Sequence, residues 1–146
     1  MFSLELIMSA DPVTVSPSTT LDDAIAIMQD HNFRHLPVVD RRGVLVGLLT
    51  QSDVLAATDS ILRDRENRLP VTQLPVEDVM VTRVMTVDVV TSLRGAAKLI
   101  EKHKIGCLPV LQGDRVVGII TDSDFVAVAI NLLEQLEDSE PDEEAV

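Results

Sequence analysis

Two short segments of the chain carry hydroxyl and carboxylate side chains at the same spacing. The two sets are Thr50, Ser52 and Asp53, and Thr121, Ser123 and Asp124. Each Asp is expected at the start of a helix, where its carboxylate can accept hydrogen bonds from both hydroxyls of a ribose and where free backbone amides attract phosphate. The same carboxylate could instead complement the helix dipole and cap its amides, worth about 0.3–1 kcal/mol. On physical grounds alone both interpretations stay open.

Catalytic constellations do not appear in the sequence. The histidines His31, His35 and His103 lack the His-x-x-x-His spacing of a metal site, and Cys107 has no partner cysteine. A Cys107–His pair would suggest a nucleophile, but Cys107 lies in a predicted strand, which favours a buried structural thiol. Neither Gly-rich phosphate-loop signature occurs. We therefore expect no enzyme activity, no metal site and no required cofactor.

The composition is typical of a small cytoplasmic protein. Hydrophobic residues make up 46% of the chain, but Trp and Tyr are absent, so the core must be aliphatic. The longest apolar run, residues 125–130, has six residues, whereas a membrane span needs roughly 20. The N-terminus lacks the features of a signal peptide, and a single cysteine fits a reducing compartment. We expect no membrane partner.

The formal net charge of −12 is concentrated at the C-terminus. Seven acidic residues and no basic ones lie from Glu134 onward, so the first 133 residues carry only −5 of that charge. Such a run is typical of a solvated, disordered tail. Nucleic acid is not expected as a partner, because neutralising its phosphates needs a basic surface.

The sequence is internally duplicated. Residues 8–15 return as residues 80–87, at an offset of 72. The Leu-Pro-Val segment 36–38 returns at the same offset, and the segment 46–53 recurs one residue closer, at 117–124. Three matches in the same order indicate a repeat protein.

Each copy predicts the same order of elements. A short β-rich stretch at 13–15 or 85–87 leads to a helix with one apolar face, whose caps are expected at Thr20 and Ser92. A hairpin follows, with strands expected at 36–39 and 44–49, and at 108–111 and 116–120. Gly43 and Gly113 are expected in its turns, and Pro37 and Pro109 at a strand start or sheet edge. A last helix starts near Ser52 or Ser123.

The predicted fold class is therefore α/β (α+β), with two pseudo-symmetric β-α-β-β-α repeats packed sheet to sheet. A repeat of roughly 55–60 residues is marginal alone, and packing two copies together solves that problem. We expect the first repeat at 7–62, a connector at 63–78, the second repeat at 79–136 and a disordered acidic tail at 137–146. The predicted core residues share inward-facing positions: Leu21, Ile25, Met28, Val38, Leu48, Leu93, Ile100, Val110, Ile119, Phe125, Ala129 and Leu132.

The chain resembles the CBS domain family over about residues 7–133. The resemblance is carried by the duplicated Leu-Pro-Val strand and by the duplicated Gly-x-x-Thr-x-Ser-Asp segment at 47–53 and 118–124. It implies a regulatory module that binds AMP, ADP, ATP or S-adenosylmethionine in two clefts between the repeats. It also implies a homodimer and a regulated protein that the sequence does not identify. The alternative is a structural dimerisation module without a nucleotide ligand.

The resemblance also assigns roles to residues. Asp53 and Asp124 would take the ribose hydroxyls, with Thr50 and Thr121 near the phosphate. The other expected contacts are Arg34, His35, Ser52, Ser123, Cys107 and Thr14. Because the Asp of one repeat would face the Leu-Pro strand of the other, Asp124 and Thr121 should share a cleft with Arg34 and His35. Asp53 and Thr50 should face the uncharged Gly106 and Cys107, so we expect the two clefts to be unequal. Arg34 and His35 could also be an ordinary exposed pair.

A homodimer is also predicted by the last helix. Its apolar face at 125–136 offers more surface than the module needs for its own core, and exposed stripes of this kind mark interfaces.

Overall fold

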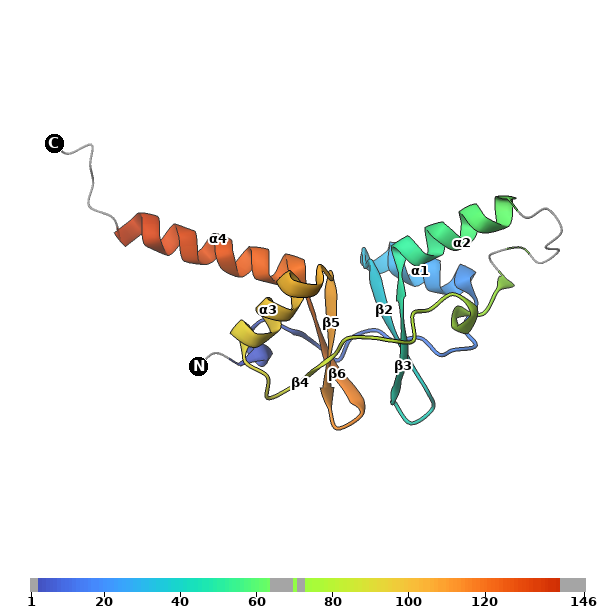
Figure 1. The fold of residues 1–146 in the computed structure, drawn as a ribbon, viewed down its shortest axis with the longest axis horizontal. Coiled ribbons are helices and arrows are strands. Elements are labelled where there is room, and N and C mark those ends of the chain that lie inside the picture. Colours follow the sequence, from blue (N-terminus) through green and yellow to red (C-terminus); the bar gives the residue numbers. More distant parts are fainter. Residues whose placement is uncertain (1–2, 64–69, 71–72, 140–146) are drawn as a thin grey trace.

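Two similar halves lie side by side in an elongated molecule (Figure 1). The computed structural model describes residues 3–63, 70 and 73–139. In chain order its elements are η1 (Leu4–Leu6), β1 (Ser9–Ala10), α1 (Leu21–His31), β2 (His35–Val39), β3 (Leu45–Thr50), α2 (Gln51–Arg63), η3 (Val76–Asp78), β4 (Val87–Asp88), α3 (Leu93–His103), β5 (Cys107–Gln112), β6 (Arg115–Thr121) and α4 (Asp122–Ser139). The predicted mixed α/β class with two pseudo-symmetric repeats is confirmed.

An antiparallel hairpin forms the centre of each half. β2 pairs with β3, and β5 pairs with β6, each with a register shift near the turn. The chain reverses through Gly43 and Gly113, whose φ angles of +82° and +67° suit glycine because it has no Cβ to clash. A helix precedes each hairpin and another follows it directly, as the sequence predicts.

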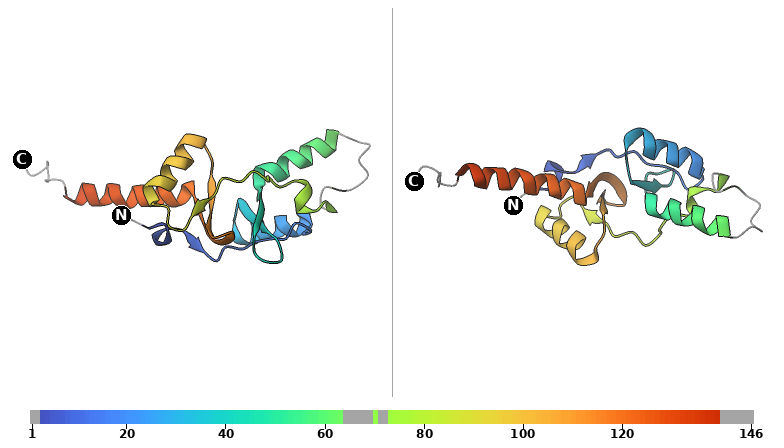
Figure 2. Two further views of the ribbon diagram at one scale, coloured as in Figure 1. Left: turned by 60° about the horizontal axis from the view of Figure 1, so that its bottom comes forward. Right: turned by 90° about the horizontal axis from the view of Figure 1, so that it is seen from above.

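The leading segment of each repeat crosses into the other half. β1 pairs with β6, where Ser9 lies opposite Ile119, while Val81 forms a bridge with Leu48 on β3. Figures 1 and 2 show both crossing segments, in blue and in yellow-green, between the two halves. The halves are therefore interlocked rather than merely adjacent.

The two aliphatic cores reflect this crossing. Leu4 of η1 is fully buried in the core of the second half, and Val76 of η3 is fully buried in that of the first. Both residues occupy matching positions, 72 residues apart. The end of the predicted connector thus belongs to the folded body, while its residues 64–69 and 71–72 lie outside the described residues.

Helix caps fix where α1 and α3 begin. The Thr20 hydroxyl accepts a hydrogen bond from the Asp23 amide at 3.3 Å, and the Ser92 hydroxyl accepts one from the Gly95 amide at 3.0 Å. Such caps satisfy amides that have no partner inside the helix. Both predicted caps are confirmed.

The predicted core is correct except near the C-terminus. Buried positions are Leu21, Met28, Val38, Leu48 and Val110, and partly buried ones are Ile25, Leu93, Ile100, Ile119 and Phe125. Ala129 and Leu132 are exposed, so their predicted burial is wrong. The reason is visible in Figure 1, where α4 leaves the body of the protein after its first turns. This helix includes residues 137–139 of the predicted tail, and residues 140–146 lie outside the described part.

The prediction for Pro109 is also wrong. Pro37 lies in β2, an edge of its two-stranded sheet, but Pro109 lies in the middle of β5, an inner strand of the sheet β1-β6-β5-β4. β4 has only two residues and pairs with β5 from Val110 onward. Pro109 is tolerated because its missing donor faces the short β4 side, where little of the ladder depends on it.

Candidate functional site

A cavity of about 690 Å³ opens between the two halves, at the ends of the hairpins opposite to the turns. It is lined from both repeats by the residues before β2 and β5, the first turns of α2 and α4, and part of the N-terminal segment. Its lining comprises Ser9, Pro12, Val13, Asn32, Phe33, Arg34, His35, Thr50, Gln51, Ser52, Gly106, Ile119, Thr121, Asp122, Ser123 and Asp124.

Hydrogen bonds to the backbone place both helix starts at this cavity. The amide of Gln51, the first residue of α2, donates to the carbonyl of Arg34 at 2.9 Å. In the second half the amide of Asp122 donates to the carbonyl of Gly106 at 3.1 Å. Each helix therefore starts directly beside the residue that precedes the Leu-Pro strand of its own repeat.

Each Thr holds the Asp three residues later. Thr50 Oγ1 donates to Asp53 Oδ2 at 2.6 Å, and the Asp53 amide donates back to Thr50 Oγ1 at 3.1 Å. Thr121 donates to Asp124 Oδ2 from its amide at 2.8 Å and from its hydroxyl at 3.2 Å. Both carboxylates are thus fixed in orientation at a helix start, an arrangement that suits a ligand hydroxyl pair and also serves as a cap.

The two Asp residues do not lie alike with respect to the cavity. Asp124 and Thr121 line it together with Arg34 and His35, as the repeat pairing predicts. Thr50, Ser52 and Ser123 line it too, but Asp53 is not among the lining residues. The first-repeat site is therefore not a mirror copy of the second.

His35 lies partly buried at the centre of the site. Burial is the main cause that lowers its pKa below 6.5, and Arg34 adds to this, while the Asp122 carboxylate opposes it. The ring lies close to Gly106, since a Cβ built there would be 3.4 Å from His35 Nε2. The His35 ring of the first repeat therefore lies at ordinary contact distance from residue 106 of the second repeat.

Besides Asp53, two other predicted contacts lie away from the cavity lining. Cys107 is buried, and burial together with the charges of Asp122 and Asp124 raises its pKa to about 12. It is the structural thiol that its strand position predicts, with no tendency to ionise near neutral pH. Thr14 is exposed and does not line the cavity.

Sequence reasoning missed several lining residues, of which Asp122 matters most. The signal was present, because Asp122 occupies the variable position of the duplicated Thr-x-Ser-Asp segment, where the first repeat has Gln51. Five other missed lining residues also lie inside duplicated segments: Ser9, Pro12, Val13, Gln51 and Ile119. Two lie outside them, Asn32 and Phe33.

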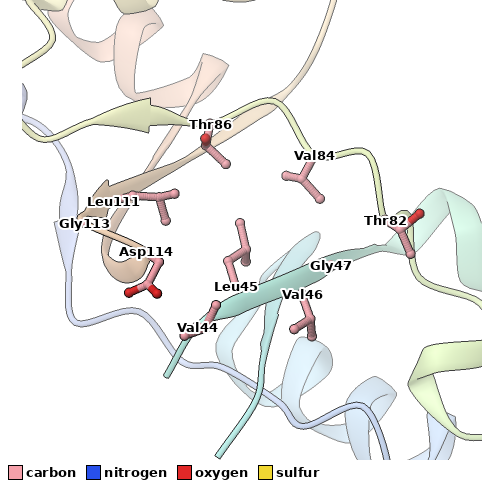
Figure 3. Close-up of a pocket in the computed structure, with 10 residues that line it drawn as sticks. All are labelled: Val44, Leu45, Val46, Gly47, Thr82, Val84, Thr86, Leu111, Gly113 and Asp114. Atoms are coloured by element: carbon pink, nitrogen blue, oxygen red, sulfur yellow. The ribbon is translucent and has the colours of Figure 1, made fainter. Parts of the chain in front are cut away.

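A smaller cavity of about 300 Å³ lies on the turn side of the hairpins. Figure 3 shows Leu45, Leu111, Val84 and Thr86 around it. The Leu45 amide donates to the Asp114 carbonyl at 3.3 Å, which joins the two hairpins beside this space. Its lining is mostly apolar and carries a single charged side chain, Asp114.

The described residues contain neither a candidate membrane span nor a candidate metal site. No helix there has the length and apolar character needed to span a bilayer. Nor do three or more His, Cys, Asp or Glu side chains gather there as a metal site would require.

Comparison with known proteins gives a consistent family. The family model of the CBS domain matches residues 4–60 and 76–131. The chain is 35% identical over 125 residues to the CBS domain-containing protein YhcV of Bacillus subtilis, which covers 86% of this chain and 84% of YhcV. The crystal structure of AcuB from Vibrio cholerae superposes with a TM-score of 0.80 at 43% identity, over 97% of this chain and 99% of that one.

One similar structure contains a nucleotide. CBSX2, solved in complex with AMP, has a TM-score of 0.77 and 27% identity, over 90% of this chain and 98% of that one. The family assignment is supported by the two repeats, by the family model that matches both of them, and by structural neighbours with the same fold. The chain belongs to the CBS domain family.

Proposed function

We propose that this protein is a regulatory module that senses adenine nucleotides, or the related adenosyl ligand S-adenosylmethionine, in the cavity between its two repeats. It performs no chemistry on the ligand. The observation that carries the proposal is the meeting of Arg34 and His35 from the first repeat with Thr121 and Asp124 from the second, around one cavity.

The chemistry of this group fits an adenosine phosphate. Asp124 is a fixed carboxylate that can accept from the ribose hydroxyls, and Arg34 can donate to a phosphate through a charge-assisted hydrogen bond, roughly twice as strong as a neutral one. Pro12, Val13 and Ile119 supply an apolar wall for a purine. The cavity volume of about 690 Å³ lies in the range of small-molecule sites.

Similar proteins support the ligand class. CBSX2 was solved with AMP, and the CBS domain pair of MJ0100, with a TM-score of 0.77 and 27% identity, with 5′-methylthioadenosine and S-adenosyl-L-methionine. We extend adenosine recognition to this chain. We further propose that it works as a homodimer in the cytoplasm, that its repeats span 7–62 and 79–136, and that it controls another protein.

A thermal-shift series with AMP, ADP, ATP, S-adenosylmethionine and NAD tests the proposal. A ligand at a hundredfold excess over its dissociation constant should add about 2.7 kcal/mol to the free energy of unfolding. For a chain of this size, that means a rise of several degrees in Tm. If no adenine-containing compound at millimolar concentration raises Tm, the proposed function is wrong.

That outcome would favour the second candidate, a module that only mediates association. The observation in its favour is the face of α4, where Val126, Ile130, Leu132, Leu133 and Leu136 are each more than half exposed. This face does not depend on a ligand in the cavity.

A further inference from the structure

The charges at the centre of the cavity are unbalanced. Among the described residues of its lining, Arg34 is the one permanently charged cation, whereas Asp122 and Asp124 are two carboxylates. Asp124 lies against Thr121, where it can meet a ribose. No ligand group has been proposed for Asp122. Its counterpart in the first repeat is the neutral Gln51, which lines the same cavity.

Asp122 lies beside the basic pair of the first repeat. A Cβ built on Gly106 would lie 3.4 Å from His35 Nε2 and 3.7 Å from Asp122 Oδ2, so the ring and the carboxylate approach the same point from opposite halves. The Ser123 amide donates to Asp122 Oδ1 at 2.8 Å, which fixes the carboxylate. A negative charge is therefore held close to His35, in the cavity that Arg34 also lines.

The position of Asp122 limits how many phosphate groups of a ligand the cavity can neutralise. Arg34 can neutralise one phosphate group, but a second or third phosphate would find no further permanent cation in the lining and would approach Asp122. His35 does not fill this gap at pH 7.5, because burial lowers its pKa. Like charges a few ångströms apart repel each other, and they do so more strongly in a partly buried site than in water.

We propose that Asp122 is a specificity-determining residue that restricts the cavity to adenosine ligands with no more than one phosphate. The inference rests on the proposed nucleotide function and adds the class of ligand that this chain selects. The affinity of the wild type should fall in the order AMP, ADP, ATP.

Calorimetry on Asp122→Asn tests this. Asparagine keeps the Oδ1 acceptor for the Ser123 amide and removes only the charge. The dissociation constants of ADP and ATP should fall about three- to tenfold, with a smaller gain for AMP and no change for adenosine. S-adenosylmethionine, which is positively charged on its 5′ side, should bind more weakly to the variant. A gain in affinity for ATP together with a loss for S-adenosylmethionine would indicate an effect of charge, whereas a general change of the cavity would affect both ligands in the same direction.

Asp138→Asn is the matched control. It removes the same charge from the same helix, 16 residues further along, or about 24 Å at 1.5 Å per residue. It should bind all five ligands as the wild type does. If ATP binds the wild type as tightly as AMP does, or if Asp122→Asn does not narrow the gap between the dissociation constants of ATP and AMP, the inference is wrong while the nucleotide function stands. If none of the five binds either protein, the proposed function itself fails.

Discussion

The carboxylate of Asp124 and the ring of His35 come from different repeats and face one cavity. Asp124 is oriented by the amide and the hydroxyl of Thr121, so its geometry exists before any ligand arrives. His35 lies close to Gly106 of the second repeat, where an added Cβ would make an ordinary contact with its ring. The cavity lining is asymmetric at the residue before each Leu-Pro strand, because Gly106 occupies in the second repeat the position that Arg34 has in the first.

The lowered pKa of His35 predicts a pH dependence of stability. Because the folded-state pKa lies below the unfolded value of 6.5, the unfolded chain binds more protons as the pH falls below about 6.5. The stabilising contribution of neutral His35 is therefore complete above that pH and is lost as the pH falls through 6.5 toward the folded-state pKa. His35→Gln should lose less unfolding free energy than the wild type between pH 7.5 and 5.5, as measured by urea denaturation. An equal loss in both proteins would show that His35 does not cause the dependence.

At the scale of the elements, the sheets depend on glycines covered by methionines. Gly47 on β3 lies under the Met80 side chain, and Gly118 on β6 lies under that of Met8. Each methionine belongs to the segment that crosses into the other half. A side chain at either glycine would push against the crossing segment that joins the halves.

Gly47→Ala should therefore destabilise the protein. Its new Cβ would meet Met80 and lie 3.0 Å from the Val81 carbonyl oxygen, a backbone atom bonded to the Leu48 amide at 2.9 Å. Overpacking of this kind costs about 1–3 kcal/mol, which urea denaturation can measure. Gly106→Ala is the control for stability, because its φ is not positive and its new Cβ would meet its nearest neighbour, His35 Nε2, at an ordinary contact distance of 3.4 Å. If Gly47→Ala has the same free energy of unfolding as the wild type, the segment with Met80 and Val81 can shift without loss of stability, and this prediction is wrong.

The sequence predicts these elements well because periodicity and turn chemistry are local. The hairpins, their glycine turns and the caps Thr20 and Ser92 all follow from residues a few positions apart. The crossing of residues 4–10 and 76–81 could not be predicted, because both halves have the same pattern and local rules do not say which core a segment enters. Pro109 was misplaced for a similar reason, since the length of β4 depends on tertiary packing.

The candidate site was predictable where the family resemblance says which residues of the two repeats face each other. Asp124, Thr121, Arg34 and His35 were predicted to share a cleft, and the structure places all four around one cavity. Thr14 and Cys107 were predicted from the repeat and its resemblance, and neither lines the cavity. Strand position alone does not tell which side of a chain a cavity is on.

At the scale of the whole molecule, the halves are interlocked and α4 projects beyond them (Figure 2). Fully burying one Leu or Ile side chain is worth about 1.5–3 kcal/mol, so the exposed face of α4 is costly in a lone monomer. A second copy of the chain would cover it.

Light scattering should accordingly report a dimer of this 16.0 kDa chain at micromolar concentration. The double variant Leu132→Glu with Leu136→Glu should be monomeric, because charges on both helices would be buried against each other. Val90→Glu is the control, since Val90 is 85% exposed in a turn away from α4. A wild-type monomer would contradict the homodimer, and so would a dimer that survives both Glu substitutions.

Calorimetric titration of AMP into the wild type, Asp124→Ala, Asp53→Ala and Arg34→Ala tests the central claim most directly. The claim is that AMP binds between the repeats, with its ribose at Asp124 and its phosphate at Arg34. Asp124→Ala should weaken AMP binding far more than Asp53→Ala, and Arg34→Ala should lose AMP while still binding uncharged adenosine. Equal losses at Asp53 and Asp124, or normal AMP binding by Arg34→Ala, would contradict it.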